Sequence, residues 1–166
     1  GEDQSSLVLG NGRPFFAKII NPKKRNRILR KSSDLDSVYL SELKKIYVQP
    51  KGSIPFKSEV SITIDTKKPI SLTQLKKLKT LENMEIKDSS RDKKNTHKRI
   101  YKVDYKRLGK TSFILELFVD GGLSIKSFVQ NSDLVPNVSE LLGNRCKCIK
   151  FDFKNIVIWI NQAFLY

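Results

Sequence analysis

The sequence predicts an α+β fold in which a mixed, largely antiparallel sheet carries a few short helices. First, alternating β-branched stretches recur along much of the chain, as at residues 59–64 and 111–119. Second, clear helical periodicity is confined to residues 72–81. Third, the elements run as strands, one helix, more strands, short helices and a strand, which is not the regular alternation of a wound parallel sheet.

The N-terminal third of the chain predicts strands and a basic loop. Residues 7–9 and 14–20 are strand-like and flank the turn Gly10-Asn11-Gly12. Residues 22–31 are basic with little periodicity, which favours an exposed loop. Residues 38–48 alternate in part and predict a long strand that ends before a Pro-Lys-Gly sequence.

The middle of the chain predicts a strand followed by a helix. Residues 59–64 alternate cleanly and are expected to form a strand with one solvated face. Ser71 is expected to cap a helix over residues 72–81. The helix places four leucines on one stripe, and Lys76, Lys77 and Lys79 lie outside it; the leucines are Leu72, Leu75, Leu78 and Leu81.

The C-terminal half predicts a hairpin, two short helices and a last strand. The hairpin joins residues 99–108 to residues 111–119 through a turn at Gly109, and Gly121-Gly122 ends its second strand. A polar, flexible loop is expected ahead of the hairpin, at residues 88–97. Helices are expected at residues 124–129 and 138–142. The last strand is expected at residues 148–159, with Phe151 and Trp159 as core residues.

The charge balance favours a polyanionic partner. The 166 residues carry 32 Lys and Arg against 17 Asp and Glu, a net charge of +15. Such a field attracts nucleic acid, although a Lys-rich composition with solvated faces gives the same count. A membrane surface ranks third, because no basic amphipathic helix, lipidation signal or apolar run of about 20 residues is present. We therefore expect an RNA partner and no membrane association.

Cysteine and histidine usage argues against disulfides and metal. Cys146 and Cys148 are two residues apart on an expected strand, where they share a face and are poorly placed to pair with each other. His97 is the one histidine, so no zinc site can be assembled. The sequence also has no phosphate-cradling glycine loop and no Ser/His/Asp triad. We expect reduced thiols, no metal, and an intracellular location in the nucleus or cytoplasm.

Two stretches of the chain resemble a known family. The first is Gly122-Leu123-Ser124-Ile125-Lys126-Ser127-Phe128, followed by Pro136-Asn137-Val138-Ser139-Glu140-Leu141-Leu142-Gly143. The second is Leu9-Gly10-Asn11-Gly12-Arg13-Pro14-Phe15. They are similar to motifs of the archaeal and eukaryotic pseudouridine synthases that act on uridines 54 and 55 of tRNA. Between them, residues 21–25, 68–71 and 97–99 follow the family's order and spacing.

The resemblance implies a site and a reaction. The family's catalytic aspartate falls on Asp3, whose carboxylate would attack a uridine so that the uracil can rotate and rejoin through carbon 5. Lys126 would be the cation that keeps this carboxylate ionised inside a pocket. Ile125 and Phe128 would form apolar wall beside the flipped base, and Arg13 would lie beside the pocket. The substrate would be the TΨC arm of tRNA, and no cofactor is needed.

Basic segments supply expected RNA contacts, and two functions stay open. Phosphates of the tRNA would contact Lys23, Lys24, Arg25, His97, Lys98 and Arg99. The family's pocket tyrosine aligns with Glu59 or its neighbours, and a second tyrosine with Ser124. The alternatives are therefore an active isomerase and a catalytically inactive RNA-binding relative. We expect residues 1–166 to be the C-terminal portion of the catalytic domain, its N-terminal region absent or supplied by a partner chain.

Overall fold

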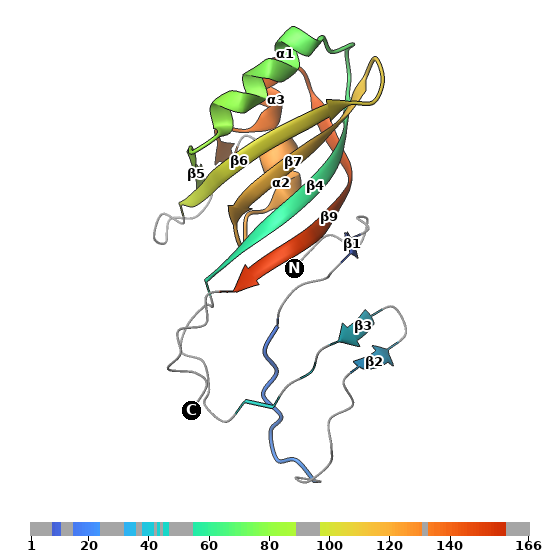
Figure 1. Ribbon diagram of the computed structural model, residues 1–166, viewed down its shortest axis with the longest axis vertical. Coiled ribbons are helices and arrows are strands. Elements are labelled where there is room, and N and C mark those ends of the chain that lie inside the picture. Colours follow the sequence, from blue (N-terminus) through green and yellow to red (C-terminus); the bar gives the residue numbers. More distant parts are fainter. Residues whose placement is uncertain are drawn as a thin grey trace. The chain divides into compact units, whose positions relative to one another are not determined.

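The computed structural model describes residues 8–10, 15–23, 32–35, 38–41, 43, 45–46, 55–88, 97–130 and 133–158. These described residues belong to two compact units. The first unit holds residues 8–10 and the described residues from 55 to 158. The second holds the described residues from 15 to 46. The first unit contains the larger sheet and the helices (Figure 1).

The first unit is built on a seven-stranded sheet with the order β1-β9-β4-β7-β6-β5-β8. Neighbouring strands are antiparallel, except that β1 runs parallel to β9. The expected α+β class, with a mixed and largely antiparallel sheet and a few short helices, is confirmed. The strands are β1 (Val8–Gly10), β4 (Phe56–Thr66), β5 (Glu85–Asp88), β6 (Lys98–Arg107), β7 (Ser112–Asp120), β8 (Leu134–Val135) and β9 (Cys146–Ile158).

The alternation of the long strands gives the sheet two unlike faces. On β4, Val60, Ile62 and Ile64 are buried, whereas Ser61 and Thr63 between them are partly exposed and the flanking Glu59 and Asp65 are exposed. Side chains of a strand alternate between its two sides, so a clean alternation buries one side only. The buried side, called the core face below, packs with the helices into one cluster. The other side is called the open face.

Short helices complete the core. Ser71 caps the first of them as expected: its hydroxyl accepts from the Gln74 N–H at 3.2 Å, and its own N–H donates to Gln74 Oε1 at 2.9 Å. Of the leucine stripe, Leu75, Leu78 and Leu81 are fully buried, but Leu72 opens the helix and stays 56% exposed. The helices are α1 (Leu72–Lys76), the 3₁₀ helix η1 (Lys77–Leu81), α2 (Ile125–Gln130) and α3 (Val138–Leu142).

Irregular pairings re-aim side chains at three points of the sheet. The register of β9 against β4 shifts between Glu59 and Val60 and again between Thr63 and Ile64. The register of β6 against β7 shifts between Ile100 and Lys102, which leaves Tyr101 as the extra residue of a β-bulge. A bulge moves the alternation on by one residue and turns a side chain in a new direction.

Other expectations on the second half of this unit are also confirmed. β6 and β7 form the expected hairpin, and α3 has the expected bounds. Both Cys146 and Cys148 are free and buried on one face of β9, and Phe151 is in the core. Strand β5 was not predicted, and Trp159 and residues 89–96 of the expected loop lie outside the described residues.

The second unit contains a two-stranded antiparallel ribbon, β2 (Ser32–Leu35) with β3 (Val38–Ser41). The strand expected at residues 38–48 is too long, because Leu43, Lys45 and Ile46 are outside any strand. The strand expected at residues 14–20 is wrong over its described part, residues 15–20. Their apolar side chains are 50% to 77% exposed, and a strand needs a paired neighbour and a surface to bury that side.

Candidate functional site

The turn after β7 fixes the end of the sheet where the motif residues begin. The Gly121 N–H donates to the Phe56 carbonyl at 2.7 Å, and Lys98 Nζ donates to the Gly121 carbonyl at 2.7 Å. A Cβ at Gly121 would lie 2.3 Å from the Phe56 ring. Gly122 has a φ of +84°, a backbone conformation that residues other than glycine rarely adopt. The backbone conformation requires glycine at Gly122, and a side chain at Gly121 would have to displace the Phe56 ring. The turn ties together the ends of β4, β6 and β7.

Helix α2 begins directly after this turn and presents Lys126. The Phe128 N–H donates to the Ser124 carbonyl at 2.9 Å, which starts the helix. Ile125 is 4% exposed and Phe128 is fully buried in the core, whereas Lys126 between them is partly exposed. Burial raises the pKa of the Cys148 thiol, and the charge of Lys126 opposes that rise. The Lys126 ammonium therefore lies within electrostatic range of Cys148 on β9.

A cleft opens beside the start of α2. Its walls are mostly apolar, with Ser58 and Asp120 as the polar side chains, and Ile125 lies in its lining. Phe128 is not part of this lining, since the core encloses it. The cleft is small, about 40 Å³, and apolar walls with a few polar groups are typical of ligand sites. The lining residues are Phe56, Ser58, Val119, Asp120, Gly122, Leu123, Ile125 and Phe153.

The N-terminal motif reaches the same end of the sheet. Strand β1 pairs with β9 in parallel, with Gly10 opposite Phe153, which lines the cleft. Leu9 and Gly10 of the motif therefore lie on the strand next to β9, the strand that contributes Phe153 to the cleft. Asp3, Arg13, Lys24 and Arg25 lie outside the described residues.

The basic residues at the start of β6 lie at the end of the sheet that holds the cleft. The Arg99 N–H donates to Asp120 Oδ2 at 2.9 Å, and Asp120 lines the cleft. The side chains of Arg99 and His97 are exposed, and His97 Nδ1 is 3.6 Å from Glu85 Oε2. Lys98, engaged with the turn, is partly buried. Lys23 is exposed in the other unit.

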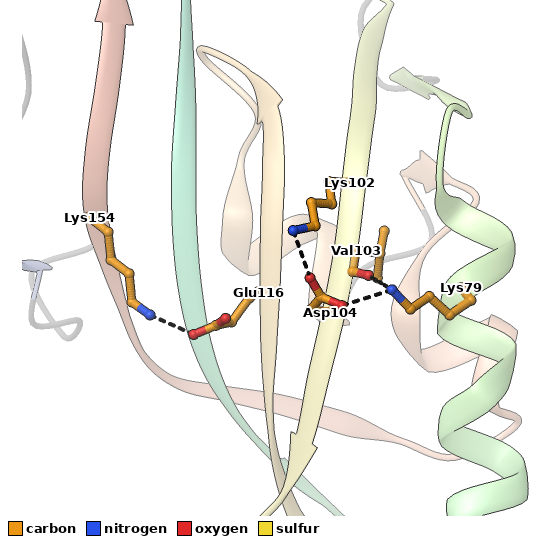
Figure 2. Close-up of polar contacts among 6 residues, drawn as sticks. All are labelled: Lys79, Lys102, Val103, Asp104, Glu116 and Lys154. Carbon is orange, nitrogen blue, oxygen red and sulfur yellow. Dashed lines mark hydrogen bonds and ion pairs between the residues drawn. The ribbon is translucent and has the colours of Figure 1, made fainter.

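The open face carries paired charges. Figure 2 shows Lys154 of β9 reaching Glu116 of β7 at 2.5 Å, and Asp104 of β6 held between Lys102 at 3.4 Å and Lys79 at 2.8 Å. The hydrogen bond from Lys79 holds the pKa of Asp104 below its usual value, although partial burial opposes it. Within the described part of the chain, no three His, Cys, Asp or Glu side chains gather as a metal site would require.

Sequence reasoning found only part of this site. Ile125 and Lys126 were identified through their motif, and the structure places them beside the cleft and near Cys148. Asp120, Phe56 and Ser58 were not identified, because nothing in their local sequence marks them. They meet at the cleft because β4 pairs with β7, which sets Ser58 opposite Val119.

The class of protein follows from a family comparison. The family model described as "Pus10, C-terminal" matches residues 1–157, and the chain belongs to this family. The similarity to the tRNA pseudouridine synthases that the motifs indicate is thereby confirmed.

In the described part of the chain, no helix is long and apolar enough to span a membrane.

Curated relatives carry a more particular name. The tRNA pseudouridine synthase Pus10 of Nitrosopumilus maritimus is 40% identical over 158 residues, which are 95% of this chain and 41% of the relative. That of Cenarchaeum symbiosum is 34% identical over 95% of this chain and 39% of the relative. The chain thus spans about 40% of the length of these two relatives.

A solved structure also matches part of the chain. It is titled "Structure of H/ACA RNP bound to a substrate RNA containing 2'-deoxyuridine" and superposes with a TM-score of 0.49 at 13% identity. The match covers 60% of this chain and 28% of the other chain.

Proposed function

We propose that the chain is the part of a tRNA pseudouridine synthase that isomerises uridine to pseudouridine in the TΨC arm. The observation that carries the proposal is membership of the Pus10 C-terminal family over residues 1–157. In the reaction, the bond from the ribose to N1 of uracil breaks, and a bond to carbon 5 forms in its place. The proton on carbon 5 is released to water, and N1 takes up a proton in exchange. Uridine and pseudouridine are isomers of the same oxidation state, so the step needs no redox cofactor.

Asp3 attacks the uridine, and Lys126 keeps its carboxylate ionised. Burial in a closed pocket would favour the neutral acid, so a fixed cation is needed beside it. Val8, five residues after Asp3, pairs with Phe151 on β9, and Cys148, which Lys126 influences, is three residues before Phe151. Five extended residues span at most about 17 Å, a length that allows the Asp3 carboxylate to approach this part of β9.

The cleft beside α2 receives the flipped uracil. Ile125 and Leu123 supply apolar wall, and Ser58 and Asp120 supply the polar groups that a base edge can contact. Arg13 is three residues after Gly10, which lies opposite the lining residue Phe153. Three residues span about 10 Å, so the guanidinium can reach the rim of the cleft.

The tRNA backbone lies along the basic residues near this end of the sheet. Arg99 and His97 have exposed side chains beside the cleft, and the chain as a whole carries a charge of +15. Lys23, which belongs to the second unit, and its neighbours Lys24 and Arg25 are further phosphate contacts in this proposal. Phosphate contacts release counterions, so the affinity for tRNA should fall steeply between low and physiological salt.

A non-catalytic RNA-binding relative is the second candidate. It is favoured by Glu59 and Ser124, which stand where the family has tyrosines. Glu59 is exposed on the open face, paired in register with Phe118. In this alternative the chain keeps the fold and the charge and binds tRNA without isomerising it.

The test is release of tritium from carbon 5 of uridine in unmodified tRNA. The unaltered chain should release tritium, and Asp3→Asn should abolish release while tRNA affinity stays within about twofold. Glu2→Gln is the matched control, because it removes a neighbouring carboxylate in the same way and should leave release unchanged. Binding of tRNA by the unaltered chain without any release would select the non-catalytic alternative.

A further inference from the structure

An aromatic pair stands on the open face, beside the end of the sheet that forms the cleft. The ring centroids of Tyr101 and Phe118 are 5.6 Å apart at an interplanar angle of 48°, and both side chains are partly exposed. Tyr101 is the extra residue of the bulge in β6. Ile100 before it is fully buried, so Tyr101 lies on the open face. The bulge lets Lys102, opposite Phe118, lie on that face as well before Val103 returns to the core.

The pair is held in place by the cleft wall. The Tyr101 hydroxyl donates to Asp120 Oδ1 at 2.9 Å, and the other oxygen of that carboxylate accepts from the Arg99 N–H. Asp120 also lines the cleft. One carboxylate therefore connects the ring of Tyr101, a basic strand end and the cleft, and it fixes the ring before any ligand binds.

A cation accompanies the rings. Lys57 Nζ lies 3.7 Å from the centroid of the Tyr101 ring and 6.0 Å from that of Phe118. Lys57 follows the cleft residue Phe56 on β4, and the exposed side chain of Arg99 lies at the start of β6. Aromatic faces beside cations complement a nucleotide, which offers a flat base to the rings and a phosphate to the ammonium.

We propose that Tyr101 and Phe118 form a stacking platform for an RNA base adjacent to the target uridine, with Lys57 as the phosphate contact of that nucleotide. The proposal rests on the proposed function and adds a subsite to it. The base replaces the Lys57 ammonium over the Tyr101 ring, and the ammonium moves to the phosphate. The exchange is favourable because base–aromatic stacking is stronger than a cation–π contact at a partly exposed site.

The platform is tested by the dissociation constant for a TΨC stem-loop RNA. Tyr101→Leu should weaken binding about tenfold, whereas Tyr101→Phe keeps the ring and should bind within about twofold of the unaltered chain. Phe118→Leu should also weaken binding and serves if Tyr101→Leu fails to fold. The matched control is Tyr105→Leu on the same strand, whose ring packs against the core and should not affect affinity.

Two further readouts separate stacking from a structural role. The first readout uses a set of stem-loop RNAs, each lacking one base near the target uridine. For one of these RNAs, Tyr101→Leu and the unaltered chain should bind with the same affinity. Lys57→Gln should lower the salt slope of binding by about one, and Tyr101→Leu should leave that slope unchanged. Equal affinities of Tyr101→Leu and the unaltered chain, or a penalty that persists at every abasic position, would overturn the platform.

The stacking platform and the proposed activity can be refuted independently of each other. RNA binding that depends on Tyr101 but gives no tritium release contradicts the activity and supports the platform. Tritium release with affinity that is indifferent to Tyr101 and Phe118 supports the activity and contradicts the platform.

Discussion

The two faces of the sheet come from the same strands but have different tasks. On β7, Phe113 and Leu115 point into the core and are fully buried, whereas Glu116 and Phe118 belong to the open face. The core face holds the helices and fixes the turn at Gly121 and the start of α2. The open face holds ion pairs and the Tyr101–Phe118 rings. Substitutions on one face should therefore change folding, and substitutions on the other should change RNA binding.

The largest expected effect compares two phenylalanines of one strand. Phe113→Ala removes a fully buried ring and should lower the free energy of unfolding by about 3–5 kcal/mol. Phe118→Ala removes a partly exposed ring from an aromatic pair and should lower it by about 1 kcal/mol. Urea unfolding followed by circular dichroism measures both. Equal losses would mean that the two faces are not divided as described.

A smaller effect belongs to a thiol of the core face. Burial raises the pKa of Cys146 to about 11 from its ordinary 9.0, and the hydrogen bond with Ser139 opposes the rise. A raised pKa means that the folded state holds the proton more tightly. The resulting stability is fully present below pH 9.0 and is lost as the pH rises toward 11, by about 2 kcal/mol.

The measurement for Cys146 is the free energy of unfolding between pH 8 and pH 11, compared with that of Cys146→Ala. The difference between the two proteins isolates the thiol from the lysines and tyrosines that titrate in the same range. A difference that stays constant across this range would show that the thiol is not buried as the structure has it.

The smallest effect belongs to an ion pair of the open face. Lys154 and Glu116 are each about half exposed, at 51% and 48%. Solvent screens such pairs, so a double-mutant cycle with Lys154→Gln and Glu116→Gln should give a coupling of about 0.5 kcal/mol that 1 M salt removes. A coupling above about 2 kcal/mol would contradict the solvent exposure of this ion pair.

Periodic elements could be predicted from the sequence because their signals are local. The alternation of β4, the hairpin of β6 and β7 and the Ser71 cap all depend on residues that are close together in the sequence. Strand β5 has four residues and pairs through only two of them with β6, which is too short for an alternation to show. Leu72 fits the helical stripe but opens the helix, where no neighbouring element covers it.

The candidate site divides in the same way. Ile125 and Lys126 could be predicted because they belong to one contiguous motif. The cleft could not, since its residues come from three separate stretches of the chain and meet through the pairing of β4 with β7 and β9. The aromatic pair joins Tyr101 of β6 to Phe118 of β7, and such a contact is visible only once the two strands are set in register.

The central claim is that the cation of Lys126 keeps the carboxylate of Asp3 ionised in the pocket. The most direct test is the pH dependence of tritium release from unmodified tRNA, measured for the unaltered chain, Lys126→Arg and Lys126→Met. Without the cation the pKa of the carboxyl rises, so release by Lys126→Met should be lost at a higher pH as the solution is acidified, while Lys126→Arg follows the unaltered chain. Acid limbs that coincide for all three proteins would contradict the claim.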